Sequence, residues 1–483
     1  MRKVLFASSE VYPFVKTGGL ADVSASLPVA LHALGHDVRI VMPAYRACLQ
    51  QLADYQVIAS LRLQGYTLPI EILATTLPDS ELIVWLVHSP YHFDRSGGPY
   101  QQENGKDWHD NAQRFALFCR AVVALAIDDV ALNWQADLIH CNDWQTGLIP
   151  ALLSTRPNRP KTIFTIHNLA YQGIFDYQTF SLLELPQELW SITGIEFYGQ
   201  ISFMKGGLIF ADHITTVSPQ YAQEICHPEF GYNLAGLLQH LTEQGKVTGI
   251  LNGIATDIWD PETDPDIDWH YSAKRLSNKK KNKAILQKKM ALPMKKEVLV
   301  LGVVSRLVAQ KGIDLIILAI DALLAEDVAI QMICLGSGEQ QYQEALLQLQ
   351  AQYPEHIAVE IGYDEALSHQ IEAGVDVFLM PSRFEPCGLN QLYSLRYGTL
   401  PIVRHTGGLA DSVIDNNNPQ QDTGFVFYQA EAKALVEVIK RALSLYQQGQ
   451  LWRKRQRNAM RQDVGWQHRA VEYSDLYQTV IQS

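Results

Sequence analysis

Short apolar runs rich in β-branched residues recur along the first half of the chain, and each is followed by a segment with helical spacing of apolar residues. The pattern predicts strands at residues 4–7, 38–41, 83–87, 138–140, 162–166, 214–217 and 247–251. Alternation of strand and helix is typical of a mostly parallel sheet with helices on both faces. The run at 247–251, followed by Asn252 and Gly253, predicts the last strand of a first domain that ends near Ile254.

The second half repeats this alternation, with predicted strands at residues 299–304, 330–335, 357–361, 375–380, 401–404 and 424–427. A chain of 483 residues is too long for one ordinary core, and it fits two α/β domains of about 200–250 residues. We therefore expect domains over residues 1–254 and 255–465. Residues 466–483 have apolar side chains at helical spacing, which predicts an amphipathic helix that packs back on the first domain.

A strongly basic stretch, residues 274–296, follows a loop rich in proline and aspartate. Its apolar members Leu276, Ala284, Leu286 and Met290 leave room for one buried stripe. We expect a helix whose lysines lie on a solvated face, in preference to a site for nucleic acid or glucan.

Composition places the chain among globular proteins in water, with 47% hydrophobic and 19% charged residues. The formal net charge of −12 argues against a general nucleic-acid binder. No apolar stretch reaches the roughly 18 residues that span a bilayer, and the short N-terminal apolar run is expected to be a first strand and not a signal peptide. The six cysteines are scattered without a C-x-x-C pair, which favours a reducing cytoplasm over a disulfide framework or a zinc site.

Two distant segments each place a cation at the carboxyl end of a predicted strand. Lys16 and the glycines Gly18 and Gly19 follow the first strand and precede a helical segment, so backbone N–H groups and one cation can converge on an anion, most often a phosphate. Arg306 and Lys311 follow the strand at 299–304 in the same way. Two such half-sites suggest one ligand held between two domains.

The most informative local string is RFEPCGLNQ, residues 383–391, which follows the predicted strand ending at Met380. A proline that can start a helix and a glycine after a strand place Glu385 at the carboxyl end of the sheet. The backbone N–H groups from Gly388 onward can then meet an anion.

Several longer strings, in order along nearly the whole chain, carry a resemblance to a known family. They are KTGGLADV (16–23), HCNDWQTGL (140–148), TIHNLAYQG (165–173), GQISFMKG (199–206), LNGI (251–254), VSRLVAQKG (304–312), IGYDEA (361–366), PSRFEPCGLNQLY (381–393) and RHTGGLADSV (404–413). The chain resembles bacterial glycogen synthases and plant starch synthases. These are ADP-glucose-dependent glucosyltransferases with the GT-B fold, in which two Rossmann-like domains with doubly wound parallel sheets face a central cleft.

The resemblance implies transfer of glucose from ADP-glucose to the end of an α-1,4-glucan with retention of configuration, without a metal or other cofactor. It implies catalytic roles for Glu385, His167, Arg306 and Lys311. The implied donor-binding residues are Lys16, Gly18, Gly19, Asn168, Asn252, Tyr363, Cys387, Gly388, Leu389 and Asn390. The implied acceptor or sugar contacts are Asp22, Tyr100, Asp143 and Trp144, of which Trp144 could equally be a core residue.

Other chemistries have weaker support. Cys387 has no histidine in a matching motif that could activate it as a nucleophile, and Asp266-Ile267-Asp268, a D-x-D string, lies in the interdomain loop away from the other motifs. Many retaining GT-B enzymes have a ribose-binding glutamate where this chain has Tyr393, which favours the ADP-glucose branch. Asn390, where many bacterial members have threonine, resembles certain plant isoforms.

The alternatives are a UDP-glucose-dependent glucosyltransferase or sugar phosphorylase of the same architecture, and a catalytically silent glucan-binding protein. A dinucleotide-dependent oxidoreductase is more distant, because Gly336-Ser337-Gly338 is only part of the required fingerprint. The sequence leaves the oligomeric state open.

Overall fold

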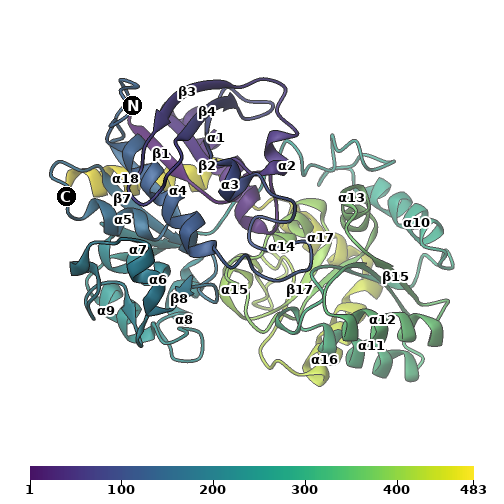
Figure 1. Cartoon of the computed structure of the whole chain (residues 1–483). Helices are drawn as coiled ribbons and strands as arrows, with labels where there is room; N and C mark the ends of the chain where they lie inside the picture. Colours follow the sequence, from purple (N-terminus) through teal and green to yellow (C-terminus); the bar gives the residue numbers. More distant parts are fainter. The chain divides into compact units, whose positions relative to one another are not determined.

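The computed structural model describes residues 1–483, which form two compact units. Unit 1 comprises Met1–Asn252 together with Trp466–Ser483, and unit 2 comprises Gly253–Gly465 (Figure 1). Ile254, near which the sequence places a boundary, is the second residue of unit 2.

Unit 1 is built on a nine-stranded sheet with the order β12-β11-β7-β6-β1-β2-β5-β4-β3. Seven of these strands correspond to the runs expected from the sequence, and they pair in parallel. The central strands are continuous apolar runs because both faces of a parallel sheet are covered. The strands are β1 (Lys3–Ala7), β2 (Asp37–Pro43), β3 (Gln56–Leu61), β4 (Ile70–Thr76), β5 (Ile83–His88), β6 (Leu138–Asn142), β7 (Lys161–Ile166), β11 (His213–Thr216) and β12 (Val247–Gly249).

Two parts of unit 1 were not anticipated. β3 and β4 extend the sheet as antiparallel strands beyond β5. The apolar run of β3 covers only residues 57–59, and three of its six residues are exposed. A separate three-stranded antiparallel sheet contains β8 (Ile174–Phe175), β9 (Glu196–Phe197) and β10 (Gln200–Ser202). These strands are too short for a periodic signal.

The helices of unit 1 are mostly short. They are α1 (Gly19–Ala33), α2 (Arg46–Leu49), α3 (Pro90–Phe93), α4 (Asn111–Ala126), η1 (Trp144–Thr146), α5 (Leu148–Leu153), α6 (Tyr177–Leu182), η2 (Gln187–Leu189), α7 (Phe203–Phe210), α8 (Pro219–Glu224), α9 (Ala235–Glu243) and α18 (Trp466–Gln482).

The last helix, α18, packs within unit 1 although it follows unit 2 in the sequence (Figure 1). The Tyr477 hydroxyl lies 2.6 Å from Nδ1 of the buried His140 on β6. Ser474 Oγ lies 2.9 Å from Nε2 of His36, which precedes β2. The buried side chains of α18 include Tyr473 and Val480, so its apolar face is docked on the sheet and on α1.

Unit 2 contains a six-stranded, all-parallel sheet with the order β15-β14-β13-β16-β17-β18. Alternate residues of β13 belong to two separate cores: Leu299, Leu301 and Val303 pack with α11 and α16, and Val300 packs with α10 and α13. Helices therefore cover both faces, and the expected doubly wound arrangement is confirmed. The strands are β13 (Leu299–Val304), β14 (Ile330–Gly336), β15 (Ile357–Ile361), β16 (Val377–Met380), β17 (Leu400–Arg404) and β18 (Phe425–Phe427).

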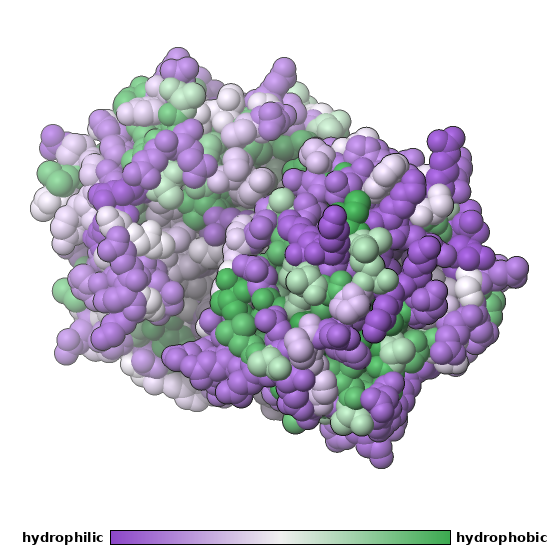
Figure 2. All heavy atoms as spheres, turned by 90° about the vertical axis from the view of Figure 1, so that its right-hand side faces the viewer, coloured by the Kyte–Doolittle hydropathy of each residue, from purple (hydrophilic) through white to green (hydrophobic).

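Helix α16 (Ala432–Gln447) of unit 2 shows the 3.6-residue period clearly. In α16 the buried residues Leu435, Val438, Ile439 and Ala442 form one stripe. The helices are η3 (Leu276–Asn278), α10 (Lys279–Lys289), η4 (Ala309–Lys311), α11 (Ile313–Ala325), α12 (Gln340–Gln352), α13 (Glu365–Gly374), α14 (Asn390–Tyr397), α15 (Gly407–Ser412), α16 (Ala432–Gln447) and α17 (Gly449–Met460). Figure 2 shows the right-hand side of Figure 1 facing the viewer. The surface in this view is mainly hydrophilic, with several apolar patches.

The expectation that the lysines of the basic stretch are all solvated is wrong for two of them. Lys279 and Lys283 are each 5% exposed. Lys279 Nζ donates to Thr399 Oγ1 at 2.6 Å and to two backbone carbonyls, and burial lowers its pKa to about 7. Lys283 Nζ lies 2.6 Å from a carboxylate oxygen of Asp376. The predicted apolar stripe is therefore interrupted by paired polar groups.

We find no helix in the chain with the length and apolar character needed to cross a membrane.

Candidate active site

The candidate residues of unit 1 lie in loops that follow three neighbouring strands. β6 pairs in parallel with β1 on one side and with β7 on the other, so the loops after these strands leave the same edge of the sheet. Glu10 and Lys16 follow β1, Asp143 follows β6 and His167 follows β7. Open parallel sheets bind ligands at this edge, outside the carboxyl ends of their strands.

The loop after β1 already binds an anionic group of the chain itself. Oε2 of Glu10 accepts hydrogen bonds from the N–H groups of Thr17 at 2.5 Å and Gly18 at 3.3 Å. Lys16 Nζ lies 3.0 Å from a carboxylate oxygen of Asp22 in α1. We expected these N–H groups to meet a phosphate; at Thr17 and Gly18 the anion present is the Glu10 carboxylate.

Asp143 links the loops after β6 and β7. Its Oδ1 accepts hydrogen bonds from the N–H groups of His167 at 2.7 Å and Asn168 at 3.3 Å. Its backbone φ of 55° is strained for a residue with a side chain. Burial raises the pKa of Asp143 to about 7, and the nearby negative charge of Glu10 acts in the same direction. The carboxyl group is therefore partly protonated at neutral pH.

The raised pKa of Asp143 predicts a stability that depends on pH. The folded chain favours the protonated form of Asp143, so protonation of this carboxyl group stabilises the fold. This stabilisation is complete below about pH 4, the pKa of an aspartate in the unfolded chain. It is lost as the pH rises through about 7, the pKa in the folded chain. Asn cannot ionise, so Asp143→Asn should gain about 2–4 kcal/mol relative to the wild type between pH 4 and pH 8. Thermal unfolding at both pH values measures this difference. Asp129→Asn, at an exposed position, is the matched control, and an equal difference at the two pH values for Asp143→Asn would contradict the assignment.

Asn142 fixes the tautomer of His167. Its Nδ2 donates to the carbonyls of Ala7 at 3.0 Å and His140 at 3.3 Å, so its Oδ1 accepts the hydrogen bond from His167 Nε2 at 2.9 Å. Burial lowers the pKa of His167 to about 3, so the ring is neutral. Nδ1 then carries a lone pair and can accept a hydrogen bond from a ligand hydroxyl.

The remaining candidates of unit 1 differ in their surroundings. Asn252 is 5% exposed, and its Oδ1 is buried without a hydrogen-bond partner. The Tyr100 hydroxyl donates to Glu10 Oε1 at 2.5 Å and lies 2.7 Å from Ser9 Oγ. Trp144 is 9% exposed, with its ring 5.0 Å from that of Phe115. Trp144 therefore has the contacts of a core residue, which is the alternative that the sequence left open.

In unit 2, the loops after the neighbouring strands β13 and β16 hold the charged candidates. Lys311 Nζ lies 2.5 Å from Oε2 of Glu385, and the Ser382 hydroxyl donates to the same oxygen at 3.0 Å. Glu385 is 6% exposed. Its carboxylate is thus held between an ammonium and a hydroxyl group, shielded from water.

Close backbone contacts join these two loops. Gly312 has a φ of 70°, and a Cβ there would lie 2.3 Å from the carbonyl oxygen of Pro381, so only glycine fits. The Arg383 N–H donates to the Gln310 carbonyl at 2.8 Å, and Gln310 Nε2 donates to the Phe384 carbonyl at 3.2 Å. These contacts explain why the glycine of VSRLVAQKG follows Lys311 directly.

A third loop, after β17, supports Glu385 from its other side. A Cβ on Gly407 would lie 2.0 Å from the Glu385 carbonyl oxygen, so RHTGG needs its first glycine for close packing. Arg404 Nε donates to the Ser382 carbonyl at 2.8 Å. The Glu385 loop is therefore fixed at its backbone as well as at its carboxylate.

The other candidates of unit 2 differ in their exposure and in their contacts. Arg306 is exposed, and its guanidinium makes no hydrogen bond or ion pair. Asn390 begins α14 and donates from Nδ2 to the Val304 carbonyl at 2.7 Å, which ties α14 to the end of β13. Cys387 is 5% exposed. Gly388 and Leu389 directly precede α14.

Tyr363 lies further along the sheet edge. It follows β15, which is separated from β16 by β14 and β13. Its side chain is 71% exposed, and its hydroxyl donates to Glu365. The structure thus pairs Lys311 with Glu385 and ties Asn390 to the end of β13, whereas Tyr363 follows β15, away from these strands.

Sequence reasoning gave no role to three residues that support the candidates. Glu10 received no role, although a carboxylate soon after a buried parallel strand is a signal for a site. Ser382 and Arg404 lie within strings that we used for the resemblance, but their contacts depend on the fold.

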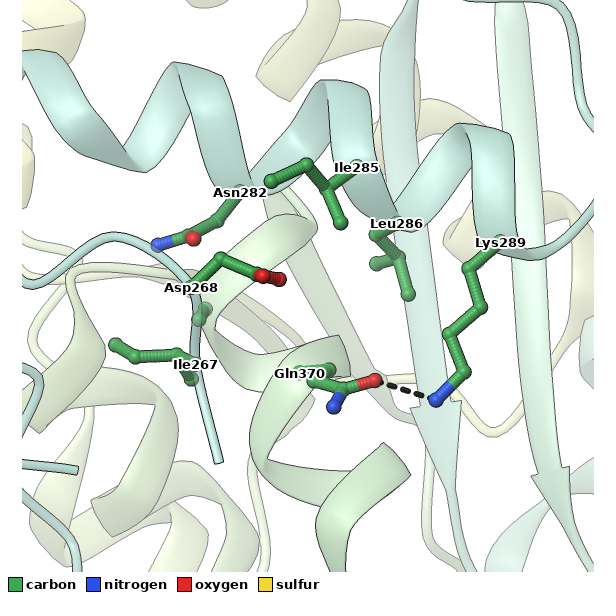
Figure 3. A pocket seen from close by; sticks show the side chains of 8 residues that line it. Ile267, Asp268, Asn282, Ile285, Leu286, Lys289 and Gln370 are labelled. Carbon is green, nitrogen blue, oxygen red and sulfur yellow. Dashed lines mark hydrogen bonds between the residues drawn. The ribbon is translucent and has the colours of Figure 1, made fainter. Parts of the chain in front are cut away.

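Two other features of unit 2 are separate from these residues. A small hollow lies between α10, α13 and the loop at Ile267 and Asp268 (Figure 3). Its volume of about 10 Å³ is far below the usual size of ligand pockets. Asp264, Asp266 and His369 have possible ligand atoms within 4.8 Å of one another. His369 Nδ1 lies 2.8 Å from Asp264 Oδ2 and so gives the buried Asp264 carboxylate a hydrogen-bond partner within the chain. We therefore assign no ligand to these three residues.

Comparison with known proteins identifies the class first. Residues 3–240 match the family described as starch synthase catalytic domain, and residues 283–461 match glycosyl transferases group 1. The chain is thus a glycosyltransferase with one matching domain in each unit.

Three relatives narrow this class. Glycogen synthase 2 of Nitrosococcus oceani is 52% identical over 100% of this chain and 98% of its own length. The glycogen synthase of Cellvibrio japonicus is 52% identical, covering 99% of each chain. The catalytic domain of starch synthase IV from Arabidopsis thaliana, bound to ADP and acarbose, is 32% identical with a TM-score of 0.89 over 100% of both chains. The chain belongs to the family of bacterial glycogen synthases and plant starch synthases, and the predicted fold class, GT-B, and glycogen synthase activity are confirmed.

Proposed function

We propose that the chain transfers the glucosyl group of ADP-glucose to the 4-hydroxyl at the non-reducing end of an α-1,4-glucan and retains the α configuration. The observation that carries the proposal is the Lys311–Glu385 pair at 2.5 Å at the carboxyl edge of the unit 2 sheet. The exposed Arg306 lies in the same segment after β13 as Lys311. The related starch synthase IV domain was solved with ADP and acarbose, and ADP is the leaving group of the proposed donor.

Departure of ADP concentrates negative charge on a diphosphate, which cations and oriented N–H groups stabilise. Arg306 and Lys311 supply the cations. Gly388 and Leu389 lead into α14, and the N–H groups at the start of this helix favour an anion. Glu385 provides a negative charge for the sugar, which becomes positively charged in the transition state.

Residues of unit 1 supply hydrogen-bond acceptors that suit the hydroxyl groups of a sugar. The neutral His167 offers a lone pair at Nδ1, and Asn252 offers a buried oxygen without a partner. We assign Lys16 and Asn168 to the donor, and Asp22 and Asp143 to the sugar or acceptor, on the family strings that contain them. Tyr100 is assigned to the sugar or acceptor on the resemblance as a whole. Trp144 lies in the same string as Asp143, but its contacts are those of a core residue.

Retention needs no covalent intermediate in this proposal. A phosphate oxygen of the leaving ADP takes the proton of the acceptor hydroxyl on the same face of the sugar, so Glu385 does not act as a nucleophile or as a general base. Incubation with a fluorinated donor followed by mass spectrometry should show no sugar ester on Glu385. An ester at this residue would replace the proposed step by double displacement.

The proposed reaction uses no metal and no other cofactor. We also propose a cytoplasmic enzyme, because none of the six cysteines is paired in a disulfide and five of them are buried.

A side-by-side assay of ADP-glucose and UDP-glucose with glycogen tests the donor. We expect glucose incorporation mainly from ADP-glucose. Faster transfer from UDP-glucose would favour the UDP-glucose-dependent alternative. Retardation of the protein in a glycogen-containing native gel, with no transfer from either donor, would favour the silent glucan-binding alternative.

Removing one cation from each unit should slow transfer strongly. Arg306→Ala and Lys16→Ala are each expected to lower kcat/KM for ADP-glucose by at least ~30-fold, or ~2 kcal/mol, the scale for one preorganised charged contact. Steady-state kinetics measure the loss. Arg453→Ala and Lys106→Ala, at exposed positions of units 2 and 1, are the matched controls. Near-normal turnover in either test variant would remove that residue from the site.

A further inference from the structure

Glu10 is surrounded by hydrogen-bond donors. Oε1 accepts from Thr17 Oγ1 at 2.5 Å and from the Tyr100 hydroxyl at 2.5 Å. Oε2 accepts from the N–H groups of Thr17 at 2.5 Å and Gly18 at 3.3 Å. Glu10 is 3% exposed. A nearly buried carboxylate thus joins the glycine loop to a residue about 90 positions further along the chain.

No cation balances this buried charge. Glu10 makes no ion pair, and Lys16, in the same loop, lies instead 3.0 Å from the carboxylate of Asp22. Hydrogen bonds from neutral donors to a carboxylate are strong enough to hold the charge when they are well aligned. Since three of the four bonds come from Thr17 and Gly18, most of the stabilisation acts on the loop.

The donor set favours a carboxylate. The N–H groups of Thr17 and Gly18 can only donate, so a glutamine would have to turn its oxygen toward them and its NH₂ group toward the hydroxyls of Thr17 and Tyr100. In that orientation the two hydroxyls must accept instead of donate, and the hydrogen bonds to the loop lose the charge that strengthens them. An aspartate is shorter by one methylene and cannot reach the loop and Tyr100 together from the same backbone position. Glutamate therefore fits this position because of both its length and its two oxygens.

We propose that Glu10 is a positioning residue for the transferase reaction: it occupies the anion-binding N–H groups of Thr17 and Gly18 and so holds the loop in the shape that presents Lys16 and Gly19 to the donor. The inference rests on the proposed function. In this proposal the N–H groups of Thr17 and Gly18 bind the Glu10 carboxylate, and contacts with the donor sugar nucleotide are left to Lys16 and Gly19.

The test is a double-mutant cycle between Glu10→Gln and Lys16→Ala, measured as kcat/KM for ADP-glucose. We expect Glu10→Gln to lower kcat/KM by at least ~30-fold in the wild-type background and by no more than ~5-fold when Lys16 is already alanine, because the two changes remove the same contact. Glu81→Gln, an exposed site in unit 1, is the matched control. A loss that is equal in both backgrounds would overturn the proposal and indicate a structural role only.

Thr17 supplies a second, milder probe in case Glu10→Gln does not fold. Thr17→Val removes the hydroxyl donor at 2.5 Å from Oε1, whereas Thr17→Ser keeps it. We expect a loss of at least ~5-fold for the valine variant and recovery to within ~3-fold for the serine variant, at similar thermal midpoints. Equal activity of the two would contradict the proposal. A wild-type protein that transfers no glucose from ADP-glucose would instead refute the proposed function.

Discussion

Replacing Glu385 by glutamine is expected to lower kcat by about 10²–10³-fold with a small change in KM. The amide has the same shape and can keep the hydrogen bond from Ser382 at 3.0 Å, but it loses the negative charge. That charge matters most when the sugar becomes positively charged, so the loss falls on the transition state and not on ground-state binding. Steady-state kinetics with ADP-glucose and glycogen measure both constants.

The same substitution at an exposed carboxylate is the control. Glu437 lies on α16 and is exposed, so Glu437→Gln should retain normal kinetics. The account of Glu385 would be wrong if Glu385→Gln raised KM and left kcat unchanged, because the carboxylate would then act only in binding. Unchanged thermal stability of Glu385→Gln is needed for either interpretation, since Lys311 loses its partner in this variant.

Much of the fold could be predicted because a buried parallel strand can be recognised from its own short segment of sequence. Strands such as β13 and β14 are buried on both faces and therefore form continuous β-branched runs. β3 was missed because its apolar run is short and three of its six residues are exposed at an edge of the sheet. Its place in the sheet depends on pairing with β4 and not on its own composition.

The basic segment shows a limit of periodicity. Lys279 and Lys283 occupy the buried face of α10, where the pattern predicts apolar side chains. Their partners Thr399 and Asp376 lie 120 and 93 positions further along the chain. Only the fold brings these groups together, so the local sequence indicates a solvated face.

Lys283→Ala is expected to destabilise unit 2 by about 3–5 kcal/mol, the cost of removing one partner from a buried ion pair. Its side chain is 6% exposed, and its ammonium lies 2.6 Å from Asp376. It also donates to the Val298 carbonyl at 2.6 Å and the Tyr446 hydroxyl at 2.8 Å. After truncation the Asp376 carboxylate keeps only the Val300 N–H at 3.0 Å. Denaturant unfolding measures the loss.

Two further variants separate the ion pair from general effects on the helix. Lys280→Ala changes an exposed lysine of the same helix and should cost no more than ~0.5 kcal/mol. Lys283→Met combined with Asp376→Asn removes both charges and should recover most of the loss. Equal destabilisation by the single and the double variant would show that the pair is not the source of the effect.

The sequence could place the candidate residues after strands, but it could not give their contacts. Lys311 and Glu385 could each be placed after a strand, because the strands and the family strings are local features. Their pairing at 2.5 Å depends on the neighbouring order of β13 and β16. The part played by Glu10 depends on donors from two distant segments, which no pattern in the sequence connects.

A crystal structure of the complex with ADP tests the central claim most directly. The account predicts diphosphate oxygens within ~3.5 Å of the Arg306 guanidinium and the Lys311 ammonium, at the loops after β13 and β16. A diphosphate bound elsewhere, with Lys311 still paired only to Glu385 and Arg306 in contact with solvent alone, would contradict it.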